Sequence, residues 1–143
     1  MKPQSYKDYI PKGARVLHLV VTQHWLDKIA EGRKPEDFRK ISSHWIQKLF
    51  IWNSGLKILK SEAKQLEKAG IEYILKHCRF QEYDYVVLSV GYKTIRPQII
   101  SKWGGTRITV AGEQTDLGVG RFFAVDVSDV LHVLNYENQS GRR

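Results

Sequence analysis

The chain has 143 residues, 42% of them hydrophobic, which supports one domain with a buried core and leaves little room for a second. Its longest apolar runs, Val16 to Val21 and Val86 to Val90, are far too short to span a membrane, and its first residues lack the hydrophobic stretch of a signal peptide, so we expect a cytoplasmic protein without a membrane segment. The 23 Lys and Arg residues outnumber the 15 Asp and Glu, and 11% of the chain is aromatic, which favours a polyanionic partner such as nucleic acid, because cations neutralise phosphates and rings stack on bases.

Residues 1–41 predict an arm, a strand, a short helix and a second extended segment. Residues 1–13 contain two prolines and show no sustained period, so we expect an N-terminal arm. Arg15 to Val21 is almost continuously apolar, which favours a central strand buried on both faces. Thr22 is a good N-cap for the helix that follows, and Gly32 suits the left-handed residue that ends it. Residues 36–41 can then run on as an extended segment.

Helical spacing dominates the middle of the chain. Ser42 or Ser43 can cap a short helix, and Trp45 within it is either a core side chain or a stacking platform. Apolar residues recur at helical spacing from Leu56 to Lys76, and we expect Gly70 to divide this region into two helices. Four lysines form a stripe along this region, which is either a solvated face or a track for a nucleic-acid backbone: Lys57, Lys60, Lys64 and Lys68.

The second half of the chain is rich in strand signals. Tyr83 to Val90 favours a buried strand, and it runs into a loop, Gly91 to Pro97, that combines a glycine, an aromatic ring and cations. Further strands are expected, the last being one long strand or a bent pair: Gln98 to Trp103, Thr106 to Val110 and Arg121 to Leu134. Residues 111–120 are expected to form a flexible loop, and residues 136–143 a flexible tail.

The cysteine and histidine content gives no metal-ligand pattern. Cys78 is the only cysteine, so neither an intrachain disulfide nor a cysteine-rich zinc site is possible. The five histidines show no recognisable ligand spacing. We therefore expect no metal and no cofactor.

The stretch that carries most of the chemistry is Gly32-Arg33-Lys34-Pro35-Glu36-Asp37-Phe38-Arg39. If its second half is extended, Asp37 and Arg39 share one face, on a surface that already carries Lys34. An acid and two cations in this arrangement can hold an anionic or polar ligand. A surface loop of mixed charge that follows a helix-ending glycine has the same composition, so both interpretations stay open at this point.

The order of elements and the spacing Gly-x-Lys-x-x-acid-x-Arg resemble the ASCH domain, a branch of the PUA-like superfamily, whose signature is Gly-x-Lys-x-x-Glu-x-Arg. Gly32, Lys34 and Arg39 match this signature, and Asp37 stands where the family has Glu. Other segments resemble a subgroup found in phage and bacterial genomes: Trp25-Leu26-Asp27-Lys28-Ile29, Ser43-His44-Trp45-Ile46 and Gly91-Tyr92. The resemblance covers Ala14 to Leu134, interrupted by a Lys-rich helical segment at about residues 54–78, which resembles an insertion relative to the smallest members of the family.

The resemblance implies an α+β fold, built as a small PUA-like mixed β-barrel of about five or six strands with flanking helices and a Lys-rich helical insertion. It implies a single domain over residues 14–135, with a cleft where the signature residues meet the loop after a middle strand. Activities in the family diverge: some members bind RNA, one group hydrolyses the amide of acetylated cytidine, and another is described as cutting RNA. The resemblance narrows the substrate class to nucleotides or RNA without fixing a reaction.

Our first hypothesis is a module that binds RNA or a nucleotide in a basic cleft. Cations of the motif and of the loop after the middle strand would meet phosphate, and the loop's aromatic ring would stack on a base or hydrogen-bond to it. The expected ligand-binding residues are Arg39, Tyr92, Lys93 and Arg96, with Lys34 beside them.

The second hypothesis is an enzyme in the same cleft, with Lys34 and Asp37 as catalytic residues. In the amide-hydrolysing relatives the signature lysine is catalytic, and Lys34 has its place. Those relatives carry a hydroxyl residue where this chain has Asp37, and a carboxylate there would keep Lys34 protonated. Metal-free RNA cleavage, with Lys34 and Asp37 as acid and base, is therefore favoured over amide hydrolysis.

A third hypothesis is an interaction protein whose helical region, Leu56 to His77, docks an acidic partner.

Overall fold

The computed structural model describes residues 4–92, 95–111 and 120–136. Lys93, most of the predicted glycine-rich loop and most of the predicted tail lie outside these residues. The chain divides into two compact units. Unit 1 comprises Met1–Asp37, Tyr83–Gly105 and Val125–Arg143, and unit 2 comprises Phe38–Glu82 and Thr106–Ala124.

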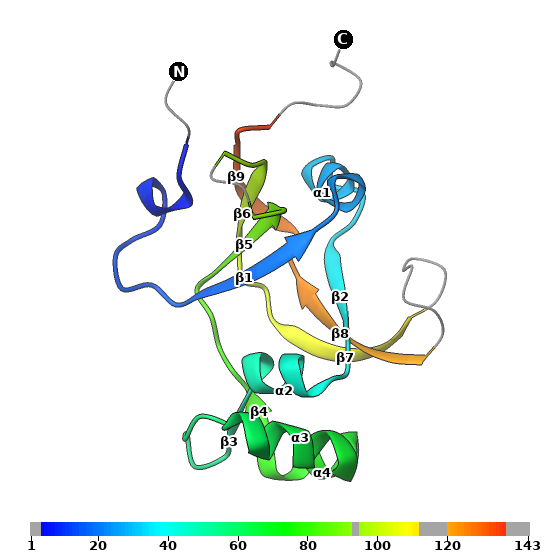
Figure 1. Cartoon of the computed structure of the whole chain (residues 1–143). Helices are drawn as coiled ribbons and strands as arrows, with labels where there is room; N and C mark the ends of the chain where they lie inside the picture. Colours follow the sequence, from blue (N-terminus) through cyan, green and yellow to red (C-terminus); the bar gives the residue numbers. More distant parts are fainter. Residues whose placement is uncertain (1–3, 93–94, 112–119, 137–143) are drawn as a thin grey trace. The chain divides into compact units, whose positions relative to one another are not determined.

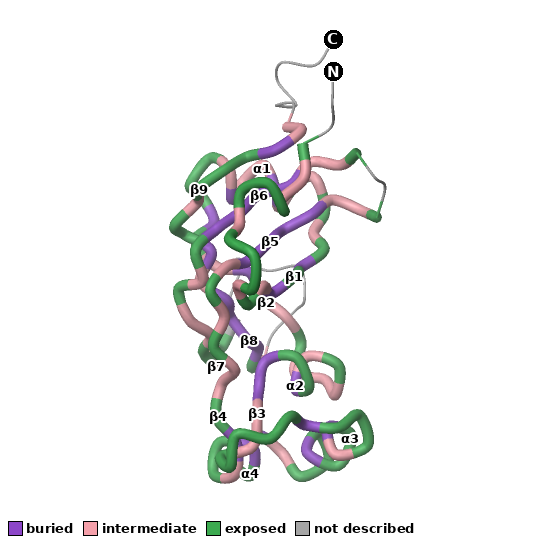
Figure 2. Tube along the Cα trace, turned by 90° about the vertical axis from the view of Figure 1, so that its left-hand side faces the viewer, coloured by how far each residue is buried: buried purple, intermediate pink, exposed green. Residues whose placement is uncertain are grey.

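Unit 1 is built on a four-stranded sheet with the strand order β1-β5-β6-β9 (Figure 1). Its elements are the 3-10 helix η1 (Tyr6–Asp8), β1 (Val16–Val21), α1 (Gln23–Ala30), β5 (Tyr85–Val90), β6 (Gln98–Lys102) and β9 (Asp129–Leu134). Strand β1 runs parallel to β5, while the other neighbours are antiparallel. The prediction that β1 is central and buried on both faces is wrong, because β1 lies at the edge of this sheet and its residues alternate between buried and exposed. Four consecutive residues of the central strand β5 are buried, as expected for a strand covered on both faces (Figure 2).

The N-terminal arm packs against one face of this sheet. Val87, Ile100 and Leu134 form a buried cluster, and Tyr6 and Ile10 of the arm lie against it. The main-chain amide of Gln4 donates to the side chain of Asn135 at 3.0 Å, and the amide of Asn135 donates back to the side chain of Gln4 at 3.1 Å. The arm is thus fixed to the end of β9 by side-chain to main-chain bonds, which hydrophobic periodicity cannot predict.

Helix α1 forms as predicted and carries the chain to the motif. The Thr22 hydroxyl accepts a hydrogen bond from the amide of Trp25, while Leu26 and Ile29 are fully buried. Gly32 has φ +75°, a conformation that favours glycine, and its amide donates to the carbonyl of Ile29 at 3.0 Å. The helix therefore ends in a closed turn that directs the chain into β2 (Glu36–Lys40).

Unit 2 combines three helices with short strands. Its elements are α2 (Ser43–Leu49), β3 (Phe50–Trp52), α3 (Lys60–Ala69), α4 (Ile71–His77), β4 (Cys78–Phe80) and β7 (Thr106–Ala111). Strand β2 begins in unit 1 and ends in unit 2, and β8 (Gly120–Asp126) runs from unit 2 into unit 1. The sheet order is β2-β8-β7, and β3 pairs with β4 in an antiparallel ladder.

The core of unit 2 joins its helices to an aromatic cluster. Helices α2 and α3 pack together, with Ile46 of α2 and Leu66 of α3 among their buried residues (Figure 1). The ring of Phe50 stacks on Phe80 with 4.4 Å between centroids and meets Phe123 edge-on at 5.6 Å. Burial of the α3 face explains why this helix forms although it carries many charges.

The predicted α+β class is confirmed, but several details differ. Among the described residues the three sheets stay open, and none closes into a barrel. Gly70 divides the Lys-rich region with φ +99°, as expected, but α3 begins at Lys60 rather than at Leu56. Lys57 instead forms a β-bridge with Ile51, so only the other three lysines of the stripe lie on α3. Strands β3 and β4 were not predicted.

The single-domain prediction for residues 14–135 stays a prediction. Neither unit is one continuous stretch of chain, because unit 1 is assembled from three segments and unit 2 from two. Residues Arg121 to Leu134 were expected to form one long strand or a bent pair, and the structure has the pair, β8 and β9. No helix in the described ranges is long and apolar enough to cross a membrane.

Candidate functional site

Lys34, the motif lysine, is nearly buried in unit 1. Only 8% of its surface is exposed, and its ammonium nitrogen lies 4.5 Å from the centre of the Trp25 ring. Trp25 belongs to the first turn of α1, so the turn at Gly32 brings the lysine back onto its own preceding helix. An ammonium over an indole face is stabilised by the ring's quadrupole, most strongly where water is excluded.

Asp37 is a second buried ionisable group in the same unit. It lies in β2 with 4% of its surface exposed, whereas its neighbours Glu36 and Phe38 are half-buried. The carbonyl of Pro35, just before the strand, accepts a hydrogen bond from the amide of Val127 at 2.9 Å. Burying a carboxylate costs free energy unless its surroundings compensate, so a buried aspartate marks either a structural polar contact or a functional site.

Arg39, the motif arginine, lies in unit 2 against a tryptophan. Its guanidinium carbon is 4.9 Å from the centre of the Trp45 ring. Trp45 is in α2, which begins where the Ser42 hydroxyl accepts a hydrogen bond from the Trp45 amide. Planar guanidinium groups stack on aromatic rings and leave their N–H edge for an anion.

A histidine and a further lysine complete this cationic group. The ring of His44 meets Trp45 edge-on, with 4.8 Å between centroids. Partial burial, together with the positive charges of Lys48 and Arg39, lowers the pKa of His44 below its ordinary value. This imidazole is therefore neutral at pH 7 and can donate or accept a hydrogen bond. We use the name α2 cation cluster for the two cations Arg39, at the end of β2, and Lys48, of α2, together with the neighbouring rings of His44 and Trp45.

The predicted loop residues lie in unit 1, after the end of β5. Val90 of β5 is in register with Val21 of β1, so this loop and the start of α1 leave the same end of the parallel pair. Tyr92 is 83% exposed, and Gly91 before it has φ +69°. The main-chain carbonyl of Arg96 accepts a hydrogen bond from Asn135, which ties the end of the loop to the last strand.

The six predicted site residues are distributed over both units. Lys34, Asp37, Tyr92 and Arg96 belong to unit 1, Arg39 belongs to unit 2, and Lys93 lies outside the described residues. Convergence of these side chains on one cleft therefore stays a prediction. The structure does bring each motif cation onto a tryptophan, a pairing that the sequence analysis missed. Trp45 had been considered as a core side chain or a stacking platform, and Trp25 as part of a family segment, but neither had been paired with a cation. The signal in the sequence was a cation within ten residues of each tryptophan, on the far side of a turn.

Within the ranges that the structure describes, no three His, Cys, Asp or Glu side chains gather closely enough to hold a metal ion. Comparisons with protein-family models, with curated proteins and with solved structures found no match to this chain.

Proposed function

We propose that the chain is an ASCH-type module with a PUA-like fold that binds RNA or a nucleotide through its motif cations. The observation that carries the proposal is the stack of Arg39 on Trp45, with Lys48 and the neutral His44 beside it. In this proposal the positive charges of Arg39 and Lys48 attract a phosphate, and the half-buried ring of Trp45 contacts a base. The formal charge of +8 attracts polyanions to the whole chain.

This proposal is tested by measuring the anisotropy of a labelled single-stranded RNA of about 12 nucleotides with matched arginine variants. Arg39→Gln removes a cation of the α2 cluster, and Arg79→Gln removes an exposed arginine from the same unit. We expect Arg39→Gln to weaken binding about fivefold, equivalent to ~1 kcal/mol, and Arg79→Gln to leave it unchanged. Equal effects of both substitutions would refute a defined site on α2.

A second candidate function is RNA cleavage, because two ionisable groups of the motif are buried. Lys34 is 8% exposed and Asp37 is 4% exposed, and buried ionisable side chains of opposite charge are candidates for acid and base catalysis. In this reaction the Asp37 carboxylate accepts the proton of a ribose 2′-hydroxyl, whose oxygen attacks the adjacent phosphorus. The Lys34 ammonium then donates a proton to the departing 5′-oxygen, so the charges balance.

Incubation with a mixed RNA and with acetylated cytidine separates catalysis from binding. Lys34→Ala removes the proposed acid, and Lys40→Ala removes a nearby exposed lysine, at the end of β2, as a control. We expect RNA fragments from the parent protein and from Lys40→Ala, and none from Lys34→Ala. If no product depends on Lys34 with either substrate, only the binding function stands.

A further inference from the structure

A cavity of about 710 Å³ lies in unit 1 at the end of the sheet opposite the Gly91 loop. It is bordered by the end of the N-terminal arm, the start of β5 and the end of β6. The cavity therefore uses none of the motif residues. Its size falls within the range of pockets that hold small ligands. The side chains that give it its chemistry are Lys12, Tyr83, Tyr85, Lys102 and Trp103.

Aromatic rings form one wall of this cavity. Tyr83 and Trp103 meet edge-on with 6.5 Å between centroids, and both are half-buried, as is Tyr85. The indole N–H of Trp103 is buried and has no hydrogen-bond partner among the described residues. Burial raises the pKa of Tyr83, so its hydroxyl stays neutral at pH 7. Rings with polar atoms beside them suit a nucleobase, which stacks and hydrogen-bonds.

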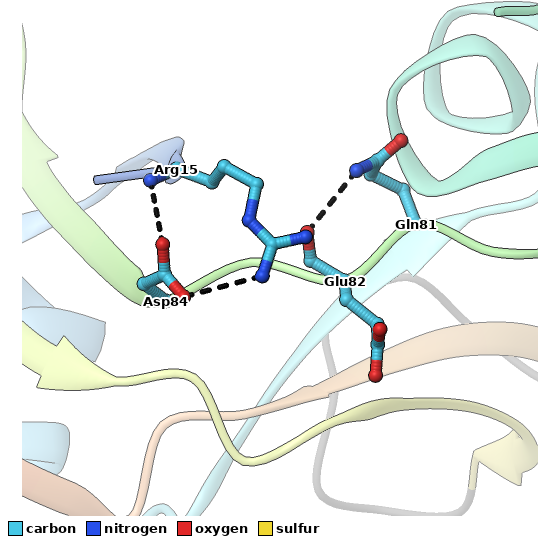
Figure 3. Close-up of polar contacts among 4 residues, drawn as sticks. All are labelled: Arg15, Gln81, Glu82 and Asp84. Carbon is cyan, nitrogen blue, oxygen red and sulfur yellow. Dashed lines mark hydrogen bonds and ion pairs between the residues drawn. The ribbon is translucent and has the colours of Figure 1, made fainter. Parts of the chain in front are cut away.

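The charged side chains of the cavity favour an anion. Its one acid, Asp84, accepts hydrogen bonds from the main-chain amide of Arg15 at 2.8 Å and from the guanidinium of Arg15 at 3.3 Å (Figure 3). The positive charge of Arg15 thus neutralises the negative charge of Asp84. The exposed Lys12 and Lys102 then give the lining a net positive charge. Lysine ammonium groups beside an aromatic wall are complementary to a phosphate attached to a ring.

We propose that this cavity binds a nucleoside monophosphate, either free or as the 5′-terminal residue of an RNA strand. The base lies against Tyr83, Tyr85 and Trp103, and the phosphate lies between Lys12 and Lys102. The inference goes beyond the proposed function, because the cavity uses residues far along the sheet from the Gly91 loop and outside the motif. Strand β5 alone, six residues long, separates the two ends of the sheet by roughly 17 Å.

The test is calorimetric titration of the full chain with AMP and UMP, with inorganic phosphate and ribose 5-phosphate as ligands that lack the base. We expect both nucleotides to bind and the two base-free ligands to bind at least about tenfold more weakly, since stacking contributes ~1–3 kcal/mol per base. Equal binding of inorganic phosphate would overturn the proposal, because the lysines would then be a simple anion site. A short RNA with a 5′-phosphate, compared with the same RNA without it, distinguishes the strand end from the free nucleotide.

Two variants assign the binding to this cavity. Lys12→Gln/Lys102→Gln changes exposed side chains and is expected to weaken AMP binding about tenfold, while Lys76→Gln, at an exposed lysine of α4 outside the cavity and the motif, leaves it unchanged. Trp103→Phe retains a ring for stacking, so it serves as a second variant, with AMP affinity reduced less than by Trp103→Leu. Loss of AMP binding in Lys34→Ala, with the lysine pair without effect, would overturn the cavity proposal and leave the motif proposal intact.

Discussion

Lys34 is a charged side chain that is almost fully buried. Because burial of a charge costs free energy, a substitution that removes the charge tests whether the fold needs this lysine. Transfer of an ammonium from water is unfavourable, and the contact with Trp25 at 4.5 Å offsets part of this cost. A methionine has a similar length and removes the charge. If the fold does not require the charge of Lys34, methionine can therefore replace it at small cost in stability.

We expect Lys34→Met to change the free energy of unfolding by no more than ~1–2 kcal/mol, because loss of the ammonium's interactions, the cation–π contact among them, and relief of desolvation oppose each other. Urea denaturation measures this change, with Lys40→Met at a nearby exposed lysine as the control. A loss of more than about 4 kcal/mol would show that the lysine is a structural requirement of the fold.

Two exposed carboxylates have lowered pKa values for different reasons, which predicts different responses to mutation. Asp84 is held mainly by the main-chain amide of Arg15 and then by its side chain, whereas Glu72 is held mainly by the side chain of Arg121, 2.9 Å away. Arg121→Gln should therefore return the pKa of Glu72 most of the way to 4.5, while Arg15→Gln should leave the pKa of Asp84 clearly below 3.8.

Carboxyl titration by NMR measures both values. The folded pKa is depressed in each case, so each group stabilises the fold above its unfolded pKa and loses that contribution as pH falls through the folded pKa. A full return of the Asp84 pKa in Arg15→Gln would show that the main-chain bond is not the main cause.

At the scale of elements, the parts predicted from sequence are those with a sustained apolar period. The segments at Val16–Val21, Gln23–Ala30 and Tyr85–Val90 were predicted because each carries its own signal over several residues. Strands β3 and β4 have three residues each, and Trp52 finds its register partner at Cys78, so no local pattern could reveal the pair. The motif residues of the candidate site could be predicted from the sequence. The contacts of Lys34 with Trp25 and of Arg39 with Trp45 could not, because they depend on the conformation of the turns that connect each pair.

Helix α3 was interpreted as an insertion, and its packing predicts that it is part of the core. Leu66 is 2% exposed and lies on α3, which packs against α2, whereas Leu59, just before the helix, is 62% exposed. We expect Leu66→Ala to lower the free energy of unfolding by ~2–5 kcal/mol and Leu59→Ala to change it by less than ~0.5 kcal/mol. Chemical denaturation of the two variants makes the comparison. Equal small effects would mean that the helix is dispensable for stability.

At the scale of the whole molecule, the formal charge of +8 does not by itself locate a binding surface. Lys60, Lys64 and Lys68 of α3 are exposed, and so is Lys48 of the α2 cation cluster. A charge that contacts phosphate releases counterions on binding, whereas a charge that only raises the overall potential releases few. The salt dependence of RNA affinity therefore distinguishes the two sets of cations.

We expect Arg39→Gln/Lys48→Gln to reduce the slope of log affinity against log salt by about 1.4, because each lost contact with single-stranded RNA removes about 0.7. The triple variant Lys60→Gln/Lys64→Gln/Lys68→Gln removes more charge and should weaken binding at low salt while leaving the slope nearly unchanged. Anisotropy titrations from 50 to 300 mM salt measure both slopes. A larger slope change in the triple variant would move the interface from α2 to α3, since only direct phosphate contacts alter the number of counterions released.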